Sequence, residues 1–277
     1  MKRILVTGAT GFIGTYVVGE LLRLGYEVVA TSADPVKARS WKWYTRTTYK
    51  PMDISLPEED CMAYFHQPDA LIHLAWEGLP DYKHLFHFED NLPRHYRFLK
   101  NMVVHGLNDL TVAGTCQEYG MREGALREDM DTLPGTPYAL AKDTLRKFLV
   151  ELSSVHPFTL KWPRLFYMYG EGQNARSLFS QLRGAIDAGD ATFPMSGGEQ
   201  VRDYLPVTDM AARLCRIALQ TDVTGVINCC SGRPVVLKDL VQTYAAGRIQ
   251  LNLGVYPYPD YEPMRFWGDT DKLNTIL

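Results

Sequence analysis

The feature that most constrains the fold is a set of three glycines directly after an apolar run at the start of the chain. Residues 4–7 read Ile-Leu-Val-Thr, and Gly8, Gly11 and Gly14 lead from them into a helical pattern. A buried parallel strand that turns through glycines into a helix is the start of a dinucleotide-binding βαβ unit. Gly8 permits the tight turn, Gly11 brings bare backbone close to a pyrophosphate, and Gly14 lets the helix pack closely on the strand. The spacing Gly-x-x-Gly-x-x-Gly is one residue longer in its first step than the usual fingerprint.

Length and composition bound the remaining possibilities. The chain has 277 residues, of which 46% are hydrophobic and 22% charged, with a net charge of −3. This is enough to bury one large α/β core and a smaller lobe, and the balanced charge argues against nucleic acid as a partner. The five cysteines have no metal-ligand spacing, so no metal site is expected. The first strand begins near residue 2 and no apolar run could span a bilayer, so we expect a cytoplasmic protein with no membrane partner.

The end of the second predicted strand, residues 26–31, bears on the choice of cofactor. An acidic residue at this position would bind the adenosine ribose and select NAD. Here Ser32 stands at that position, Asp34 lies a little beyond it, and Lys37 and Arg39 follow. A neutral residue with basic neighbours suits a 2′-phosphate, so the sequence favours NADP(H), with NAD(H) as the alternative.

Further apolar segments continue the parallel sheet. Residues 49–54 are expected to form a short third strand in which Asp53 reaches the adenine edge. Residues 70–75 form the fourth strand, and His73 inside it is interpreted as a core residue without a chemical role. The aromatic segment 76–90 follows the carboxyl end of this strand, where a ligand would lie.

A tyrosine and a lysine lie on one face of a helix predicted over residues 137–154. The fifth strand, residues 108–113, is followed by Thr115, and the helix then begins with Tyr138 and Lys142 near its start. Residues four apart project from the same helix face. An ammonium group beside a phenol favours the phenolate, so Lys142 is expected to lower the pKa of Tyr138 toward neutrality and make it a proton donor and acceptor.

With these residues in place, the sequence resembles the extended short-chain dehydrogenase/reductase family. Within it, the likeness is to the NAD(P)-dependent epimerases and dehydratases that act on nucleotide sugars, and in particular to the short dTDP-4-keto-6-deoxyhexose 4-reductases. The motifs that carry the resemblance span nearly the whole chain. They are TGATGFIG (7–14), HLA (73–75), GTCQEYG (114–120), PYALAK (137–142), WPRLFYMYG (162–170), GGEQVRDYLPVTD (197–209) and INCCSG (227–232).

The resemblance implies a catalytic trio of Thr115, Tyr138 and Lys142. Thr115 would bind the reacting sugar oxygen, Tyr138 would move the proton, and Lys142 would hold the nicotinamide ribose. The implied cofactor contacts are Gly8, Thr10, Gly11, Phe12, Ile13, Ser32, Asp53, Ile54, Leu74, Ala75 and Lys142. The implied contacts to a nucleotide-sugar substrate are Trp76, Thr115, Tyr138, Tyr167 and Arg202.

The resemblance also implies the domain organisation. Residues 1–165 would form a Rossmann-type, doubly wound α/β domain to which residues 201–232 return. Residues 166–277 would form mainly the smaller substrate-binding lobe, which ends at Leu277 without the closing helices of many relatives. The family often dimerises through the helices after the fourth and fifth strands, so a homodimer is expected.

The planar guanidinium of Arg202 suits the nucleotide diphosphate, whereas Arg176 and Arg265 are weaker candidates for the same contact. Tyr167 stands where many relatives have an Asn that contacts the substrate phosphates. This departure leaves the details of the sugar pocket open.

The residues after Thr115 narrow the reaction. Sugar 4,6-dehydratases carry an Asp-Glu pair there, but this chain has Cys116-Gln117, which disfavours dehydration. What remains is hydride transfer with one proton: reduction of a 4-keto sugar or, as the alternative, 4-epimerisation with tightly bound NAD. A non-catalytic redox sensor and a reductase of non-nucleotide carbonyls are other classes. The retained Tyr138 and Lys142 argue against the first, and Arg202 argues against the second.

Overall fold

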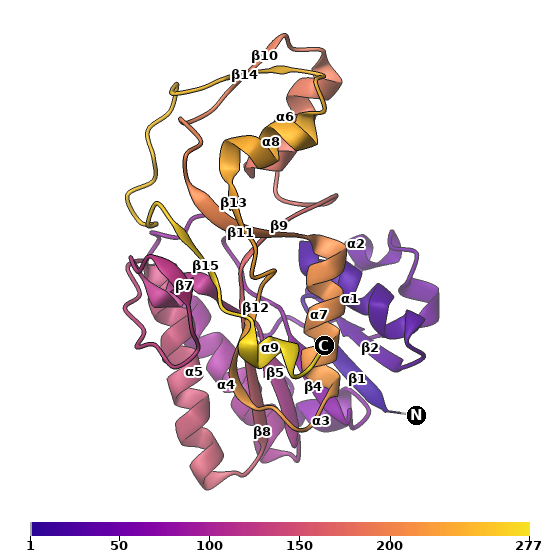
Figure 1. The fold of residues 1–277 in the computed structure, drawn as a ribbon. Helices are drawn as coiled ribbons and strands as arrows, with labels where there is room; N and C mark the ends of the chain where they lie inside the picture. Colours follow the sequence, from indigo (N-terminus) through magenta and orange to yellow (C-terminus); the bar gives the residue numbers. More distant parts are fainter. Residues whose placement is uncertain (1) are drawn as a thin grey trace.

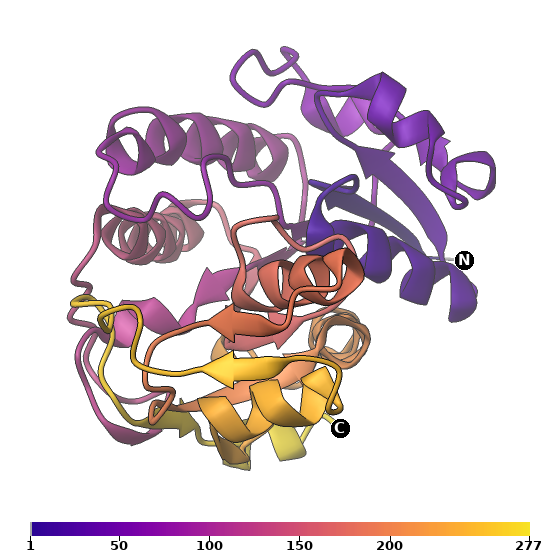
Figure 2. The ribbon, with the colours of Figure 1, turned by 90° about the horizontal axis from the view of Figure 1, so that it is seen from above.

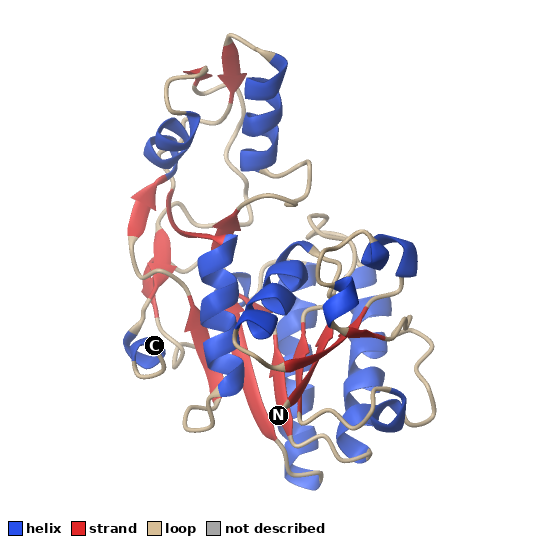
Figure 3. Cartoon of the chain, turned by 90° about the vertical axis from the view of Figure 1, so that its right-hand side faces the viewer, coloured by secondary structure: helices blue, strands red, loops and turns tan. Residues whose placement is uncertain are grey.

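The computed structural model describes residues 2–277 and contains a parallel sheet with helices on both faces (Figures 1 and 3). The strand order is β12-β8-β5-β4-β1-β2-β3, with β6 beside β8, and all neighbours run parallel. The strands are β1 (Arg3–Thr7), β2 (Glu27–Thr31), β3 (Thr48–Tyr49), β4 (Ala70–His73), β5 (Asp109–Val112), β6 (Gly114–Thr115), β8 (Thr159–Leu165) and β12 (Gly225–Cys229). The predicted Rossmann-type α/β fold is therefore confirmed.

Two apolar cores lie on the two faces of this sheet. Successive side chains of a strand point to opposite faces, and β1 accordingly sends Ile4 and Val6 into one core and Leu5 into the other. The first core packs against α1 (Phe12–Arg23) and α7 (Val207–Leu219). The second core packs against α3 (Cys61–Tyr64), α4 (Leu92–Val104) and α5 (Pro137–Val155).

The third strand is shorter than the sequence predicts. Strand β3 ends at Tyr49, and beyond it the backbone N–H groups of Lys50 and Met52 still donate to the carbonyl oxygens of Ala30 and Ser32 at 3.0 and 3.2 Å. Asp53 lies outside the strand, in a turn where its carboxylate accepts the backbone N–H of Ser55 at 2.9 Å. The expectation of a strand over residues 49–54 is therefore wrong beyond Tyr49.

A smaller lobe lies at the carboxyl ends of the strands (Figure 1). Its core joins two helices and two short strands: α6 (Leu178–Ala188), α8 (Leu237–Ala245), β10 (Thr192–Pro194) and β14 (Gln250–Asn252). Two small sheets connect this lobe to the large one. They contain β9 (Tyr167–Tyr169), β11 (Val201–Pro206) and β13 (Pro234–Val236), and β7 (Gly124–Leu126) and β15 (Phe266–Gly268). The remaining helices are α2 (Pro35–Arg39) and α9 (Asp271–Asn274).

The topology places the glycine turn where a ligand is expected. Strand β1 lies between β2 and β4, so the chain leaves it in opposite directions to build the two halves of the sheet. In doubly wound sheets the ligand binds at the carboxyl ends of the strands, at this switch point. The turn from β1 into α1 lies there, on the side of the smaller lobe.

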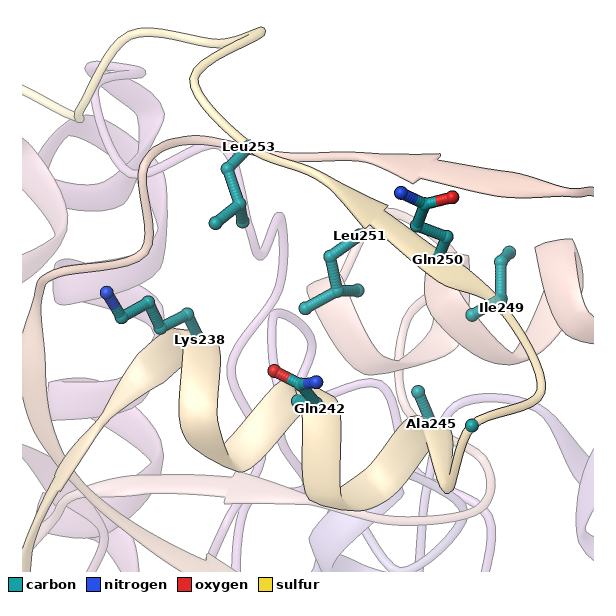
Figure 4. Close-up of a pocket in the computed structure, with 8 residues that line it drawn as sticks. Lys238, Gln242, Ala245, Ile249, Gln250, Leu251 and Leu253 are labelled. Carbon is teal, nitrogen blue, oxygen red and sulfur yellow. The ribbon is translucent and has the colours of Figure 1, made fainter.

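A separate hollow lies inside the smaller lobe, between α8 and β14 (Figure 4). Leu251 and Leu253 line one wall, and Gln242 and Ala245 of α8 line the other. Lys238 stands at one end and is the sole ionisable group among the described lining residues. This hollow therefore offers no acid–base pair and is not a candidate catalytic site.

Candidate active site

The glycine turn provides a cradle that admits no side chain. Gly8 has φ +66°, and a Cβ at this position would lie 2.8 Å from the backbone nitrogen of Ala75. A Cβ on Gly14 would lie 2.1 Å from the carbonyl oxygen of Gly8. Gly11 is the N-cap of α1, and within the described chain no side chain bonds to the N–H groups of this helix end. The turn thus presents unpaired N–H groups and the positive end of the helix dipole, which suits the pyrophosphate of a dinucleotide.

A cleft extends from this turn between the large and small lobes. It contains a majority of the predicted contact residues: Gly8, Gly11, Phe12, Ile13, Leu74, Trp76, Thr115, Tyr138, Lys142 and Tyr167. The predicted contacts that do not line it are Thr10, Ser32, Asp53, Ile54, Ala75 and Arg202. Among residues 2–277, no group of three or more His, Cys, Asp or Glu side chains could hold a metal ion.

The end of β2 carries no charged side chain, and the carboxylate that follows it, Asp34, is already hydrogen-bonded to backbone N–H groups. The Ser32 hydroxyl bonds to the Tyr49 hydroxyl at 2.9 Å. Asp34 caps α2, where its Oδ1 accepts the backbone N–H groups of Val36 and Lys37 at 2.9 Å each. Lys37, by contrast, lines the cleft. Lys37 therefore brings a cation to this end of the cleft, the Ser32 hydroxyl stands outside the cleft, and the Asp34 carboxylate is engaged by its own helix.

The three predicted catalytic side chains lie together in the cleft, and all three are buried. Thr115 ends β6, and Tyr138 and Lys142 occupy the first turns of α5. The start of α5 is fixed by the Thr136 hydroxyl, which accepts the Ala139 N–H at 3.2 Å. The Tyr138 N–H donates to the carbonyl oxygen of Tyr82 at 3.1 Å, and this bond ties the aromatic loop after β4 to the same site.

Burial sets the protonation of this site. It raises the pKa of the Tyr138 phenol above its ordinary value, and the Thr115 hydroxyl counteracts only part of this shift. Burial also lowers the pKa of Lys142 to about 7, partly offset by the negative charge of Glu118. Lys142 was expected to lower the pKa of Tyr138 toward neutrality. The pKa of Tyr138 is raised instead, because burial disfavours the charged phenolate. Tyr138 therefore holds its proton throughout the neutral range.

A buried carboxylate fixes the backbone of Thr115. Glu118 Oε1 accepts the N–H of Thr115 at 2.8 Å and the indole N–H of Trp162 at 3.0 Å. Its other oxygen accepts from Arg164 Nε at 2.7 Å. All donors to this carboxylate come from residues that are themselves buried. The carboxylate is therefore fully engaged and turned away from the cleft.

The two residues directly after Thr115 do not provide a second acid and base. Cys116 and Gln117 both line the cleft. Burial raises the pKa of the Cys116 thiol, so it stays protonated. The Gln117 amide does not titrate, and its buried Oε1 has no hydrogen-bond partner among the described residues.

Arg202 lies beside the cleft and is already paired. Its guanidinium donates to Glu262 Oε2 at 3.3 Å and to the carbonyl oxygen of Met264 at 3.0 Å, and it lies over the ring of Phe266. Glu262 itself lines the cleft. Arg176, which also lines the cleft, forms a two-pronged ion pair with Asp81 at 3.0 Å.

Two cleft residues had no signal in the sequence. Tyr261 and Glu262 come from the segment before β15. They stand far from the glycine turn and from Tyr138 in the chain, so no local spacing marks them. The aromatic content of segment 76–90 did signal Tyr82, which packs against Tyr138 with ring centroids 5.5 Å apart.

Comparison with known proteins agrees with this geometry. The profile described as "NAD dependent epimerase/dehydratase family" matches residues 4–230. The chain belongs to this family. Members of this family are enzymes that modify nucleotide sugars. The family membership predicted from the sequence is confirmed. Within residues 2–277, no helix is long and apolar enough to cross a membrane.

Two curated relatives of the family are informative. The chain is 31% identical over 269 residues to a dTDP-6-deoxy-L-talose 4-dehydrogenase (NAD(+)) of Aggregatibacter actinomycetemcomitans, covering 96% of this chain and 98% of the relative. It is 25% identical over 259 residues to a dTDP-4-dehydro-6-deoxyglucose reductase of Escherichia coli, covering 87% and 80%. A solved structure, MoeE5 in complex with UDP-glucose and NAD, superposes with a TM-score of 0.82 at 25% identity, covering 99% of this chain and 92% of that one.

Proposed function

We propose that this epimerase/dehydratase family member reduces the C4 keto group of a nucleotide-linked 4-keto-6-deoxyhexose with NAD(P)H. An example is the conversion of dTDP-4-keto-6-deoxyglucose to dTDP-fucose. The observation that carries the proposal is the meeting of Thr115, Tyr138 and Lys142 in a cleft that begins at the glycine turn. Both curated relatives are named for oxidation or reduction at C4 of a dTDP-linked 6-deoxyhexose, which supports this substrate class.

The buried side chains suit the reductive direction. A bound nicotinamide supplies the hydride that C4 receives. Thr115 donates a hydrogen bond to the oxygen at C4 as negative charge develops there. Tyr138, which burial keeps protonated, gives its proton to that oxygen, and the Lys142 ammonium stabilises the phenolate left behind.

Elimination of water is not supported by the same site. A dehydratase needs a second acid and base beside the residue that holds the sugar oxygen, and here Cys116 and Gln117 follow Thr115. The nearby carboxylate of Glu118 is held by Trp162 and Arg164. The protein is therefore proposed to carry out hydride and proton transfer alone.

We propose NADP(H) as the preferred cofactor. The end of β2 offers the Ser32 hydroxyl, and Lys37 lines the cleft, an arrangement that suits a 2′-phosphate. The dTDP-6-deoxy-L-talose relative carries NAD(+) in its name, so the two cofactors need a direct comparison.

The deciding experiment follows reduced-nicotinamide absorbance when the purified protein meets dTDP-4-keto-6-deoxyglucose, with NADPH and NADH tested separately. Stoichiometric oxidation supports a 4-ketoreductase and identifies its cofactor. A parallel assay with dTDP-fucose and oxidised cofactor tests the reverse reaction, and dTDP-6-deoxy-L-talose with oxidised cofactor tests the oxidation for which the Aggregatibacter actinomycetemcomitans relative is named. Tyr138→Phe serves as the matched inactive variant, since it removes only the acidic hydroxyl and should retain cofactor binding.

A 4-epimerase is the competing function, because it would use the same three residues through a transient ketone. It differs in keeping its nicotinamide bound. Absence of net oxidation, together with NAD found on the protein as purified and interconversion of C4 epimers, would replace the reductase with the epimerase.

A further inference from the structure

Lys142 is a buried cation without a carboxylate partner. Its side chain is 2% exposed. The buried ion pairs of this part of the chain involve Arg146, Lys161 and Arg164, and among residues 2–277 none includes Lys142. A buried charge must be compensated or it loses its proton. The groups that compensate this ammonium therefore determine whether Lys142 keeps its proton.

Two groups touch the ammonium directly. Lys142 Nζ donates to the carbonyl oxygen of Ala113 at 2.9 Å. It also lies 4.0 Å from the centroid of the Trp76 indole. The face of an indole carries negative charge density and attracts a cation, most strongly where water is excluded. Trp76 thus takes the place that a carboxylate would hold.

The Trp76 indole is fixed by a hydrogen bond at its edge and by ring stacking on its face. Trp76 Nε1 donates to His87 Nδ1 at 3.1 Å, and the ring planes differ by only 15°. His87 is fixed in turn by its Nε2, which lies 3.1 Å from the carbonyl oxygen of Asp81. His95 stacks on the indole with centroids 4.5 Å apart. A π-helix over His87–Asn91 carries His87 to this position.

The imidazoles around the indole add no competing positive charge. His73 and His95 are joined at 2.7 Å and fully buried, and His73 is also held by the Thr7 hydroxyl at 2.8 Å. Burial lowers the pKa of His73 to about 3, and it lowers the pKa values of His87 and His95 as well. The other titratable groups near Lys142 are the Glu118 carboxylate and the Tyr138 phenol.

We propose that Trp76 is a positioning residue for Lys142: its indole, fixed by His87 and His95, stabilises the Lys142 ammonium and holds it in the active-site cleft. This role rests on the proposed use of Lys142 beside Tyr138. It assigns to Trp76 a function toward the protein's own lysine in addition to the substrate contact expected from its place in the cleft.

The test replaces Trp76 with tryptophans that carry one to four ring fluorines. Fluorine withdraws electron density from the ring face but keeps the shape of the indole and its N–H donor to His87. The titration of Lys142 is read from its ¹³Cε resonance in the cofactor-loaded enzyme and assigned by its loss in Lys142→Arg. We expect the midpoint to fall stepwise along the series, by about 0.5 to 1.5 pH units in total.

The same series at Trp267, which lies in β15, is the matched control and should leave the Lys142 midpoint unchanged. An unchanged midpoint along the Trp76 series, or an equal shift along the Trp267 series, would overturn the proposal. The titration needs no sugar substrate, so it reports on Trp76 even if the proposed ketosugar is not reduced. In the kinetic assay the alkaline limb of kcat/KM should move with the midpoint.

Discussion

The backbone N–H of Thr115 donates to the Glu118 carboxylate at 2.8 Å, and the same carboxylate is paired with Arg164 at 2.7 Å. The residue that would bind the sugar oxygen is thus tied to a buried ion pair behind it. Removing one partner of such a pair leaves an uncompensated buried charge, whereas removing both does not.

Glu118→Ala is therefore expected to lower the free energy of unfolding by about 3–5 kcal/mol. Replacing Arg164 by Met in the same chain should restore part of this loss, because the orphaned guanidinium is then gone. Urea unfolding of both single variants and the double variant measures the effect. Additive losses in the double variant would show that the pair is not coupled.

The buried Lys142 makes stability depend on pH. Its folded-state pKa of about 7 lies below the ordinary value of roughly 10.4, so between these pH values the unfolded chain binds a proton that the folded chain does not. Stability contributed by this group therefore rises with pH through that window. Lys142→Met should raise the free energy of unfolding at pH 6 by an amount on the order of a few kcal/mol, and the gain should fade toward pH 10. Urea unfolding of the cofactor-free protein at several pH values measures this, and a pH-independent difference would contradict it.

Much of the framework could be predicted because it depends on local pattern. The strand expected over residues 70–75 is observed as β4, and Tyr138 and Lys142 lie on one helix face as their spacing of four predicts. The third strand is shorter than expected because the chain turns at Asp53, whose carboxylate accepts the Ser55 N–H, and apolar character alone does not reveal this turn.

The electrostatics of the site could not be predicted in the same way. The pKa of Tyr138 depends on how many elements cover it, and the pairing of Arg202 with Glu262 joins residues 60 positions apart. Such contacts are products of tertiary packing, and no periodicity encodes them. The contact between Trp76 and Lys142 is likewise a product of tertiary packing.

The cofactor proposal predicts a switch at the end of β2. Ser32→Asp should shift the preference from NADPH toward NADH, since a carboxylate binds ribose hydroxyls and repels a 2′-phosphate. The ratio of kcat/KM for the two cofactors measures the shift. Ser40→Asp, which adds the same charge at the C-terminal end of the nearby helix α2, is the control. An equal effect of both variants would remove Ser32 from cofactor selection.

The expected homodimer has a candidate surface on α4 and α5, which lie side by side (Figure 2). Large apolar side chains are exposed there, among them Val104, Leu140, Phe148 and Val155. Exposed apolar clusters of this kind mark interfaces. Phe148→Glu should convert a dimer into a monomer in sedimentation velocity, whereas Leu56→Glu, at a more exposed apolar position elsewhere, should not. A monomeric unmodified protein would rule out this assembly.

The diphosphate contact predicted for Arg202 requires that the substrate compete with Glu262. Both side chains are largely buried and 3.3 Å apart, and Glu262 faces the cleft, where its charge opposes an incoming phosphate. Arg202→Ala should raise KM by about 10- to 100-fold with a smaller effect on kcat, because a charged hydrogen bond to the diphosphate is present in ground and transition states alike. Glu262→Gln should instead lower KM, since it frees the guanidinium.

Arg176→Ala is the matched comparison, because Arg176 lines the cleft and its partner Asp81 is exposed. If Arg176→Ala raises KM while Arg202→Ala does not, the diphosphate binds at the loop between β9 and α6. The role of Arg202 is then limited to its ion pair with Glu262.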